Sequence, residues 1–429
     1  MKVLHTFISV SQIAFIVLTL AYLYQIFYMY IGFRYRKMNK ASKKAPARFL
    51  NYAVFISARN EEGVIGELIQ SLKEQTYPGS KFKIFVLADN CTDRTAEVSR
   101  RAGAVVYERF DQHQVGKGYA LNYLYHHVIR DYGEMAFDGY FVFDADNILD
   151  KNFIYEMNRT FSQGGYDCLT SYRNSKNFGT NWITAGYSIW FLREARYVNF
   201  PRHLLGNSCM ISGTGFLVSR ELLAENRGWP YHLLTEDIEF SVNCAIHDKK
   251  IGYVDDAILY DEQPETFAQS WNQRLRWSKG FFQIDWHYIP SLIHGIFTAK
   301  RNKTSCYDVL MTVAPCSILT IFLLLYNIFL FGYMQDLTIY YRVLLWHTAT
   351  RSLITALAVY YFEFLFIGIC TVATEWKRIR ATSFRKICYI WLFPIFEATY
   401  LPITMVALFK KVEWKPIAHY STEQLAARR

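Results

Sequence analysis

Long apolar runs near both ends of the chain constrain its architecture more than any other feature. Ile8–Ile31 is nearly free of charge, and a helix of about 24 residues, at ~1.5 Å per residue, crosses a ~30 Å hydrocarbon core. Further apolar runs occupy Val309–Tyr333, Leu353–Val372 and Ile387–Phe409. Segregation of apolar ends from a water-soluble middle explains how 52% hydrophobic residues coexist with 20% charged residues.

The first apolar run, residues 8–31, is predicted to be a transmembrane signal anchor. It is too long for a cleaved signal peptide, and no small-residue cleavage site follows it. Basic residues cluster between Arg34 and Arg48, and such a cluster marks the cytoplasmic side of a span. We therefore expect the N-terminus outside, the following domain in the cytoplasm, and a multi-pass protein of the plasma membrane.

The net charge of +10 also favours a lipid bilayer as a partner. The basic residues gather beside the apolar runs, where they would meet anionic lipid headgroups. A basic excess suits an anionic small substrate as well. This placement argues against nucleic acid as a partner.

The C-terminal region, residues 309–409, is expected to hold about three membrane segments, followed by a tail at 410–429. Its last run, Ile387–Phe409, is interrupted by two prolines and Glu397. A simple crossing would put the lysines that follow outside, against the positive-inside trend. The run is therefore either a crossing or a re-entrant or broken segment that lines a cavity. Glu397 at membrane depth points to a polymer path or a protein-facing cavity.

The middle of the chain, residues 50–280, alternates short apolar runs with helical stretches. The predicted strands are Tyr52–Ser57, Phe82–Ala88, Ala104–Tyr107 and Tyr140–Phe143. The predicted helices between them are Glu61–Gln75, Asp93–Ala102 and Gly116–Arg130. This alternation predicts an α/β domain with βαβ units and a mostly parallel, Rossmann-like sheet. Such sheets place their chemistry beyond the carboxyl ends of the strands.

Aromatic residues are frequent in the next segment, residues 281–300. One interpretation is an amphipathic helix that lies in the membrane interface. The other is a core helix of the catalytic domain, and the sequence favours neither.

Two carboxylates at the end of a buried strand, Asp144 and Asp146, are the strongest local signal. Residues at i and i+2 of a strand share one face, so both side chains can hold one hard divalent cation through oxygen ligands. Mg²⁺ or Mn²⁺ at this point would neutralise a diphosphate. A DxD triplet alone is common, so the signal depends on its position after a strand.

Polar residues at the ends of the first two strands predict a nucleotide-binding edge. Asn60 and Glu61 follow the first strand, and Asp89 and Asp93 follow the second. Asp89 is placed to accept a hydrogen bond from a base or a ribose, whereas Asp93 fits equally well as a helix cap. Lys117, between two glycines at a helix start, could meet a phosphate.

Leu234-Thr235-Glu236-Asp237 precedes another helical stretch. Thr235 is a natural N-cap, and the helix dipole would favour the ionised form of Asp237 in the first turn. Asp237, with Glu236 beside it, is therefore either a catalytic base that takes the acceptor's proton or part of a simple helix cap.

A predicted helix that begins near Glu265 carries Gln273-Arg274-Leu275-Arg276-Trp277. Gln273, Arg276 and Trp277 lie at i, i+3 and i+4 and share a face. An arginine there could clamp a leaving diphosphate, and a tryptophan could stack on a sugar. The alternative is an amphipathic helix near the membrane surface.

The motifs ARNEE, ADNCTD, GKGYALN, DADN, SGTGF, TED and QRLRW occur in this order. The series resembles the inverting family 2 glycosyltransferases of GT-A fold, especially membrane synthases of hyaluronan, chitin, cellulose and poly-N-acetylglucosamine. The resemblance covers about residues 50–280. It departs from the family where Ala88-Asp89 replaces a pair of aspartates.

This resemblance implies roles for individual residues. It implies that Asp89 binds the nucleoside of a UDP-sugar, that Asp144 and Asp146 hold Mg²⁺ or Mn²⁺, and that Asp237 is the catalytic base. It implies that Gly213 and Thr214 belong to an acceptor loop. It places Gln273, Arg274, Arg276 and Trp277 at the diphosphate and acceptor.

The implied function is inverting transfer from a UDP-sugar. The first expectation is processive synthesis of a poly-β-N-acetylglucosamine-like exopolysaccharide, exported across the membrane with possible accessory secretion or regulatory subunits. The second is single transfer to a lipid such as diacylglycerol, ceramide or a polyprenol, which the small membrane portion favours. A non-catalytic membrane scaffold is a remote third interpretation, since the motifs are intact.

Overall fold

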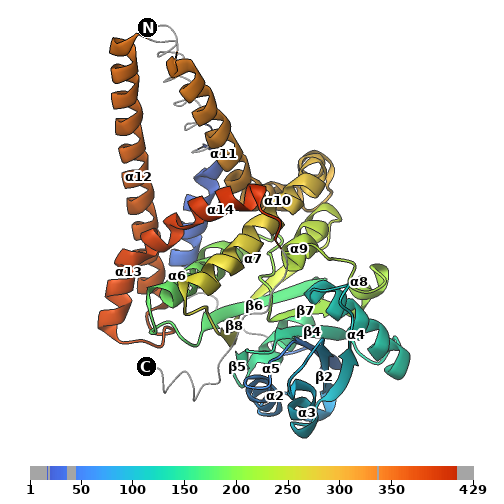
Figure 1. Ribbon diagram of the computed structural model, residues 1–429. Coiled ribbons are helices and arrows are strands. Elements are labelled where there is room, and N and C mark those ends of the chain that lie inside the picture. Colours follow the sequence, from blue (N-terminus) through green and yellow to red (C-terminus); the bar gives the residue numbers. More distant parts are fainter. Residues whose placement is uncertain (1–16, 18–19, 36–44, 336–337, 413–429) are drawn as a thin grey trace.

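The computed structural model in Figure 1 describes residues 17, 20–35, 45–335 and 338–412. Residues 20–34 are helical and include the C-terminal half of the predicted anchor. Most of the N-terminal half of that anchor, most of the basic cluster after it and most of the tail lie outside the described residues.

One eight-stranded sheet in the order β3-β2-β1-β4-β7-β6-β8-β5 forms the centre of the soluble domain. Its strands are β1 (Tyr52–Ala58), β2 (Phe82–Asp89), β3 (Val105–Arg109), β4 (Gly139–Asp144), β5 (Ile148–Leu149), β6 (Cys168–Ser175), β7 (Phe216–Ser219) and β8 (Ile251–Asp261). The predicted strands are confirmed as β1 to β4, which pair in parallel. The sheet as a whole is mixed, because β7 runs antiparallel to β4 and β6, and β5 runs antiparallel to β8.

Helices cover both faces of the sheet because its strands are apolar on both sides. On one face Val54 and Ile56 of β1 join a core with α2 (Ile65–Lys73) and α5 (Phe153–Phe161). On the other face Ala53 and Phe55 join a core with α4, α6 and α9. This alternation follows from the two-residue period of a strand. The remaining elements around the parallel half are η2 (Gly79–Lys81) and α3 (Thr95–Arg101).

A continuous helical segment lies between the sheet and the apolar helices. It consists of α6 (Trp182–Arg193), the π-helical turn η3 (Glu194–Asn199) and α7 (Phe200–Leu204). Asn181 and Thr184 form a capping box at its start. The other helices of the soluble domain are α4 (Lys117–Tyr132), α8 (Arg220–Glu225) and α9 (Glu236–Ile246).

The helices from α10 onward contain the predicted membrane segments. They are α10 (Phe267–Thr298), α11 (Lys303–Gln335), α12 (Ile339–Glu375), α13 (Ser383–Ala398) and α14 (Tyr400–Phe409). Among the described residues, α12 and the α13–α14 stretch are long and apolar enough to cross a membrane. Helices α11 and α12 project from the domain, lie apart where they join it and approach each other toward their far ends (Figure 1). Helix α11 packs on α9, α10 and α14, whereas α12 packs on α6 and α13.

The segment predicted as either an interfacial or a core helix combines features of both. It is the second half of α10, which continues without a break from the QRLRW motif. Ile284 and Leu292 are buried against α11 and α9. Trp286 and Phe297 are 85% and 73% exposed. One face is therefore core, and the other presents large apolar side chains to the surroundings.

The last apolar run is interrupted locally at Thr399, and Ser383–Phe409 is still long and apolar enough to cross a membrane, so both alternatives stay predictions. Helix α13 ends at Ala398 and α14 begins at Tyr400, with Thr399 between them. Pro394 and Pro402 flank the break. Helix α14 then packs on α10 through Ile403 and Ala407.

Candidate active site

Three of the predicted residues meet beyond the carboxyl ends of β1 and β4. The Lys117 ammonium, at the start of α4, forms an ion pair with Asp144 and donates a hydrogen bond to the Gly213 carbonyl at 2.6 Å. A methyl group on Gly213 would lie 4.0 Å from an oxygen of Asp144 and 3.9 Å from an oxygen of Asp237. The glycine loop therefore separates two carboxylates that face the same crevice.

The loop that carries Gly213 is fixed by its neighbours. The Thr214 hydroxyl accepts a 2.9 Å hydrogen bond from the Asp144 backbone N–H and donates to Asn147. Gly213 has φ of 78°, a left-handed conformation that glycine adopts without strain. Thr214 therefore lies on the loop as predicted, but it is buried and acts on the position of Asp144.

Glu236 and Asp237 begin α9 beside the crevice, where Glu236 is buried and Asp237 is partly exposed. Burial, followed by the charge of Asp237, raises the pKa of Glu236 to about 7, against the opposing charges of Lys117 and Arg276. Burial likewise raises the pKa of Asp237, although the Ile238 N–H and the same two cations oppose it. The helix terminus was expected to favour the ionised form of Asp237, but burial outweighs it. A raised pKa makes Asp237 a stronger base.

The capping interpretation of this motif is not supported for Thr235. Thr235 precedes α9, but its side chain makes no capping hydrogen bond, and its hydroxyl has no partner among the described residues. A Cβ on Gly280 of α10 would lie 2.5 Å from that hydroxyl. Helix α10 therefore approaches the start of α9 closely, which a larger residue would prevent.

The QRLRW motif lies on α10, and its two arginines point to different places. Arg276 donates a 2.8 Å hydrogen bond to the Leu234 carbonyl and acts on both Glu236 and Asp237. Arg274 is fully buried and donates to the Phe396 carbonyl at 3.1 Å. Arg274 therefore departs from the expectation that it contacts the diphosphate.

Trp277 of the motif belongs to an aromatic cluster. It packs edge-on against Tyr187 and Phe191, with ring centroids 5.7 and 6.3 Å away. Arg173 lies over the Phe191 ring at 3.8 Å and donates to the Ser212 carbonyl at 2.9 Å. Gln273 has a buried side-chain oxygen with no partner among the described residues.

The predicted nucleoside-binding residues occupy the ends of β1 and β2. Asp89 is buried and accepts a 2.7 Å hydrogen bond from Arg109. Its pKa is raised by burial, against Arg109. Asn60 accepts from the Thr92 N–H at 2.8 Å, and the Glu61 N–H donates to Thr95 at 2.8 Å. These contacts fix the two turns side by side.

The sequence allowed Asp93 to be either a helix cap or a nucleotide-binding residue. In the structure Asp93 stabilises the turn after β2. Its carboxylate accepts from the N–H groups of Thr95 and Glu62 at 3.0 and 3.1 Å. Partial burial opposes ionisation, but these hydrogen bonds lower its pKa. The structure therefore favours the capping interpretation.

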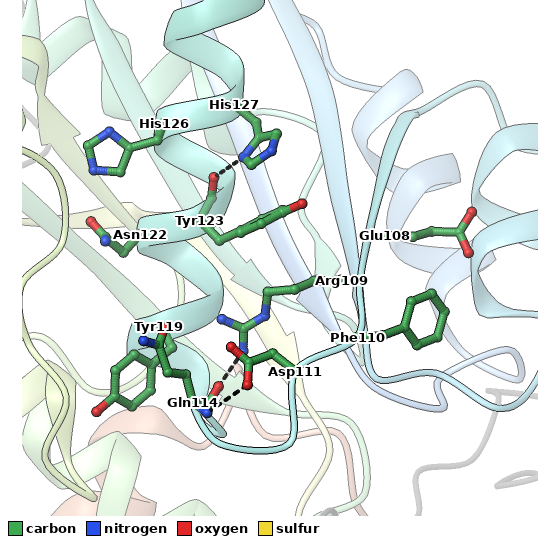
Figure 2. A pocket seen from close by; sticks show the side chains of 10 residues that line it. All are labelled: Glu108, Arg109, Phe110, Asp111, Gln114, Tyr119, Asn122, Tyr123, His126 and His127. Carbon is green, nitrogen blue, oxygen red and sulfur yellow. Dashed lines mark hydrogen bonds between the residues drawn. The ribbon is translucent and has the colours of Figure 1, made fainter.

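A pocket of about 470 Å³ lies beside Arg109, between the end of β3 and α4 (Figure 2). Tyr119, Tyr123 and His126 line it from the helix. Neither Asp144 nor Asp237 lines this pocket. It borders the nucleoside side through Arg109, which pairs with Asp89, and through Asp111, which exchanges hydrogen bonds with Asn90, so the carboxylate crevice is a separate place.

Asp146 of the predicted metal pair lies deeper than Asp144. It is buried and accepts a hydrogen bond from the Glu262 N–H at 3.2 Å. Among the described residues, no group of three or more His, Cys, Asp or Glu side chains is close enough to hold a metal ion. The donor chemistry nevertheless fits a hard cation, because Asp144 is partly exposed and already binds an ammonium ion.

Sequence reasoning did not identify two acidic residues next to the crevice. Burial, opposed by Arg173 and reinforced by Asp146, raises the pKa of Asp261 to about 6. Glu194, at the π-helical turn, accepts a hydrogen bond from the Ser212 hydroxyl. Neither residue stands in a recognisable motif. A π-helical turn in a helix that passes the site is a feature only a structure reveals.

The fold and crevice define a nucleotide-binding α/β domain with its polar groups at the carboxyl edge of the sheet. Residues 48–280 match the family described as "Glycosyltransferase like family 2", and the chain belongs to this family.

Two kinds of curated relative resemble the chain. It is 26% identical over 239 residues to a beta-monoglucosyldiacylglycerol synthase of Synechocystis sp., covering 54% of this chain and 47% of the relative. It is 24% identical over 280 residues to a poly-beta-1,6-N-acetyl-D-glucosamine synthase of Staphylococcus aureus, covering 63% and 62%. The match therefore spans about half the length of the first relative.

A solved structure supports the fold. The mannosyltransferase PcManGT from Pyrobaculum calidifontis, in complex with GDP-Man and Mn²⁺, superposes with a TM-score of 0.55. The sequences are 16% identical, and the match covers 92% of this chain and 97% of that one. At this identity the likeness concerns the fold alone.

Proposed function

We propose that this protein is a membrane glycosyltransferase that moves a sugar from a UDP-sugar onto a hydroxyl group of a lipid such as diacylglycerol. The observation that carries the proposal is the Asp237 carboxylate facing the Asp144–Lys117 pair across Gly213. A base and a cation-binding carboxylate on opposite sides of one crevice suit attack at a carbon that bears a leaving diphosphate.

In this reaction Asp237 accepts the proton of the acceptor hydroxyl. The acceptor oxygen forms a bond to the anomeric carbon, the bond from that carbon to the β-phosphate oxygen breaks, and UDP leaves. A single displacement inverts the anomeric centre. Lys117 and Arg276 supply positive charge beside the crevice, which favours the departing diphosphate. Asp89 and the turns at Asn60 and Glu61 hold the nucleoside.

Asp144 and Asp146 are the residues that would hold Mg²⁺ or Mn²⁺. The bound ion would neutralise the diphosphate as a Lewis acid. For Asp144 to bind the ion directly, Lys117 would give up its present ion pair. Lys117 would then be available to a phosphate oxygen.

A lipid acceptor is favoured by the apolar helices and by the relatives. Helices α11 and α12 pack on different partners at the domain, and α11 exposes apolar side chains such as Leu325 and Phe329. Helix α12 exposes many large apolar side chains, as expected where a helix faces lipid, although Arg342, Arg351 and Glu363 are exposed as well. Relatives from three organisms are named beta-monoglucosyldiacylglycerol synthase.

Synthesis of a β-linked exopolysaccharide is the second candidate. It was the first expectation from the sequence, and the poly-N-acetylglucosamine synthase relatives support it. The relatives do not favour it over the lipid acceptor. It would require a translocation path, which accessory subunits could complete. For both candidates we propose a multi-pass protein of the plasma membrane with its catalytic domain in the cytoplasm.

Product analysis tests the proposal. Full-length protein in lipid nanodiscs receives Mg²⁺ or Mn²⁺ and each of several radiolabelled UDP-sugars, with dioleoylglycerol in the bilayer. A single organic-soluble product is expected from one donor. A water-soluble ladder of high molecular weight would instead establish the polysaccharide synthase, and the absence of any product with all donors would contradict both candidates.

A further inference from the structure

A buried carboxylate lies at the break between α13 and α14. Glu397 is 3% exposed, and its Oε1 atom has no hydrogen-bond partner among the described residues. A buried oxygen without a hydrogen-bond partner destabilises the folded chain, so stability alone does not explain the presence of Glu397.

Two arginines face this carboxylate without reaching it. The charges that act most on Glu397 are Arg274 of α10 and Arg193 of α6. Arg274 donates to Thr399 at 2.6 Å, and its Nη2 atom is buried without a partner in the described chain. Arg193 donates to Gln25 of the N-terminal helix at 3.1 Å. Ionisable groups from three helices thus influence one place, and Glu397 and Arg274 each leave one atom there without a hydrogen-bond partner among the described residues.

The same place adjoins the catalytic crevice through α10. Gln273 directly precedes Arg274, and its side-chain oxygen is buried and unpartnered within the described residues. Arg276, less than one helical turn further along, reaches the loop that carries Asp237. One turn of α10 therefore connects the crevice with Glu397.

Close packing prevents the carboxylate from turning away. A Cβ on Gly186 of α6 would lie 2.3 Å from the ring of Phe396, the residue before Glu397. Arg274 also lies over that ring at 4.4 Å. The end of α13 is therefore held against α6 and α10, and the polar atoms face a fixed point.

We propose that Glu397 and Arg274 form a binding site for the hydroxyl-bearing headgroup of the acceptor lipid, an inference that rests on the proposed function. Glu397 accepts a hydrogen bond from a headgroup hydroxyl, and Arg274 Nη2 donates one to an ester oxygen. The headgroup thereby satisfies two groups that the folded chain leaves unpaired.

The surroundings of this site suit the rest of a lipid molecule. Trp391 and Ile395 of α13 and Leu401 of α14 are exposed apolar side chains close in sequence to Glu397. Acyl chains would lie along this outer surface, in the hydrocarbon region, while the headgroup reaches inward. A polysaccharide acceptor would find apolar side chains there instead of hydrogen-bonding partners.

Kinetics of a near-isosteric variant test the site. Glu397→Gln in full-length protein should raise the KM for dioleoylglycerol about tenfold, whereas the KM for UDP-glucose should change less than twofold. Glu375→Gln is the matched control, because Glu375 is equally buried near the membrane side but bonded to Tyr172. An unchanged KM for dioleoylglycerol in Glu397→Gln, or an equal rise in both variants, would overturn the proposal.

Equilibrium binding separates this site from the proposed function. Radiolabelled dioleoylglycerol is titrated in detergent micelles against wild type, Glu397→Gln and Glu375→Gln, without any UDP-sugar. About tenfold weaker binding only in Glu397→Gln is expected. If wild type binds the lipid but never glycosylates it, the proposed function fails and the site stands. If wild type glycosylates dioleoylglycerol and Glu397→Gln binds this lipid as tightly as wild type does, the site assignment is wrong. The assignment is also wrong if wild type does not bind dioleoylglycerol.

Discussion

Buried charges occur in two regions of this protein, and they are balanced in one and unbalanced in the other. Where α7 meets α11, Arg202 makes a two-pronged ion pair with Asp308 at 2.7 and 2.8 Å. Tyr24 and Tyr28 of the N-terminal helix donate to the same carboxylate at 3.0 and 2.8 Å. Every oxygen of Asp308 is thus satisfied.

In the catalytic crevice the carboxylates outnumber the cations. Asp144, Glu236 and Asp237 share Lys117, with Arg276 nearby. The pKa of Glu236 is raised to about 7, chiefly by burial. The balanced cluster holds three helices together, whereas the unbalanced one retains negative charge that a cation or a proton can neutralise. The difference indicates which buried charges serve structure and which serve chemistry.

The largest expected effect concerns the crevice. Asp237→Asn removes the proposed base but keeps its shape, so kcat should fall by about 10³-fold or more while UDP-sugar binding persists. Initial rates and calorimetric titration with UDP-sugar measure the two properties. Substantial turnover in this variant would refute the role of Asp237 and remove the contrast between the two regions.

Disruption of the balanced cluster around Asp308 should lower the stability of the folded protein. Asp308→Ala leaves Arg202 buried without its partner and should cost about 3–5 kcal/mol, seen as a lower Tm in detergent. Arg101→Ala breaks an exposed pair with Glu97 and is the control, with an expected loss below about 1 kcal/mol. Equal changes in Tm would show that the Asp308 cluster does not hold the helices.

Metal dependence sharpens the account of the crevice. Asp144→Asn should lower kcat about 10²-fold and abolish the stimulation by Mn²⁺ or Mg²⁺, because it removes a hard oxygen ligand. Chelation by EDTA should inactivate wild type, and added Mn²⁺ should restore it. Wild-type activity that survives chelation would exclude the metal from the reaction.

The smallest expected effect is a pH-dependent change in stability. Because the folded-state pKa of Glu236 is raised from 4.5 to about 7, its favourable contribution exists at low pH and is lost as pH rises through 7. Glu236→Gln should therefore match wild type at pH 5 and exceed its Tm by about 2–4 °C at pH 8, without divalent cations. A variant that is less stable at pH 8 would show that Glu236 is favourably ionised.

Much of the soluble fold could be predicted because its signals are local. Strands β1 to β4 were located within one or two residues, since continuous apolar runs bounded by polar turns specify buried strands. Asp144 and Lys117 could be placed at the crevice because the carboxyl ends of parallel strands meet at one edge. Strands β5 to β8 were not predicted: β5 and β7 are short and carry little periodic signal, whereas β6 and β8 are longer but include polar residues that interrupt the apolar run.

The sequence by itself determined the family, the order of the motifs and the presence of apolar segments at both ends. Only the tertiary structure decided that Arg274 turns away from Arg276, that burial outweighs the helix terminus at Asp237, and that Glu397 faces two arginines. The physical reason is the range of each effect. Periodicity and turn chemistry act between neighbours in sequence, whereas burial and charge balance depend on helices such as α6, α10 and α13 that meet only in the folded chain.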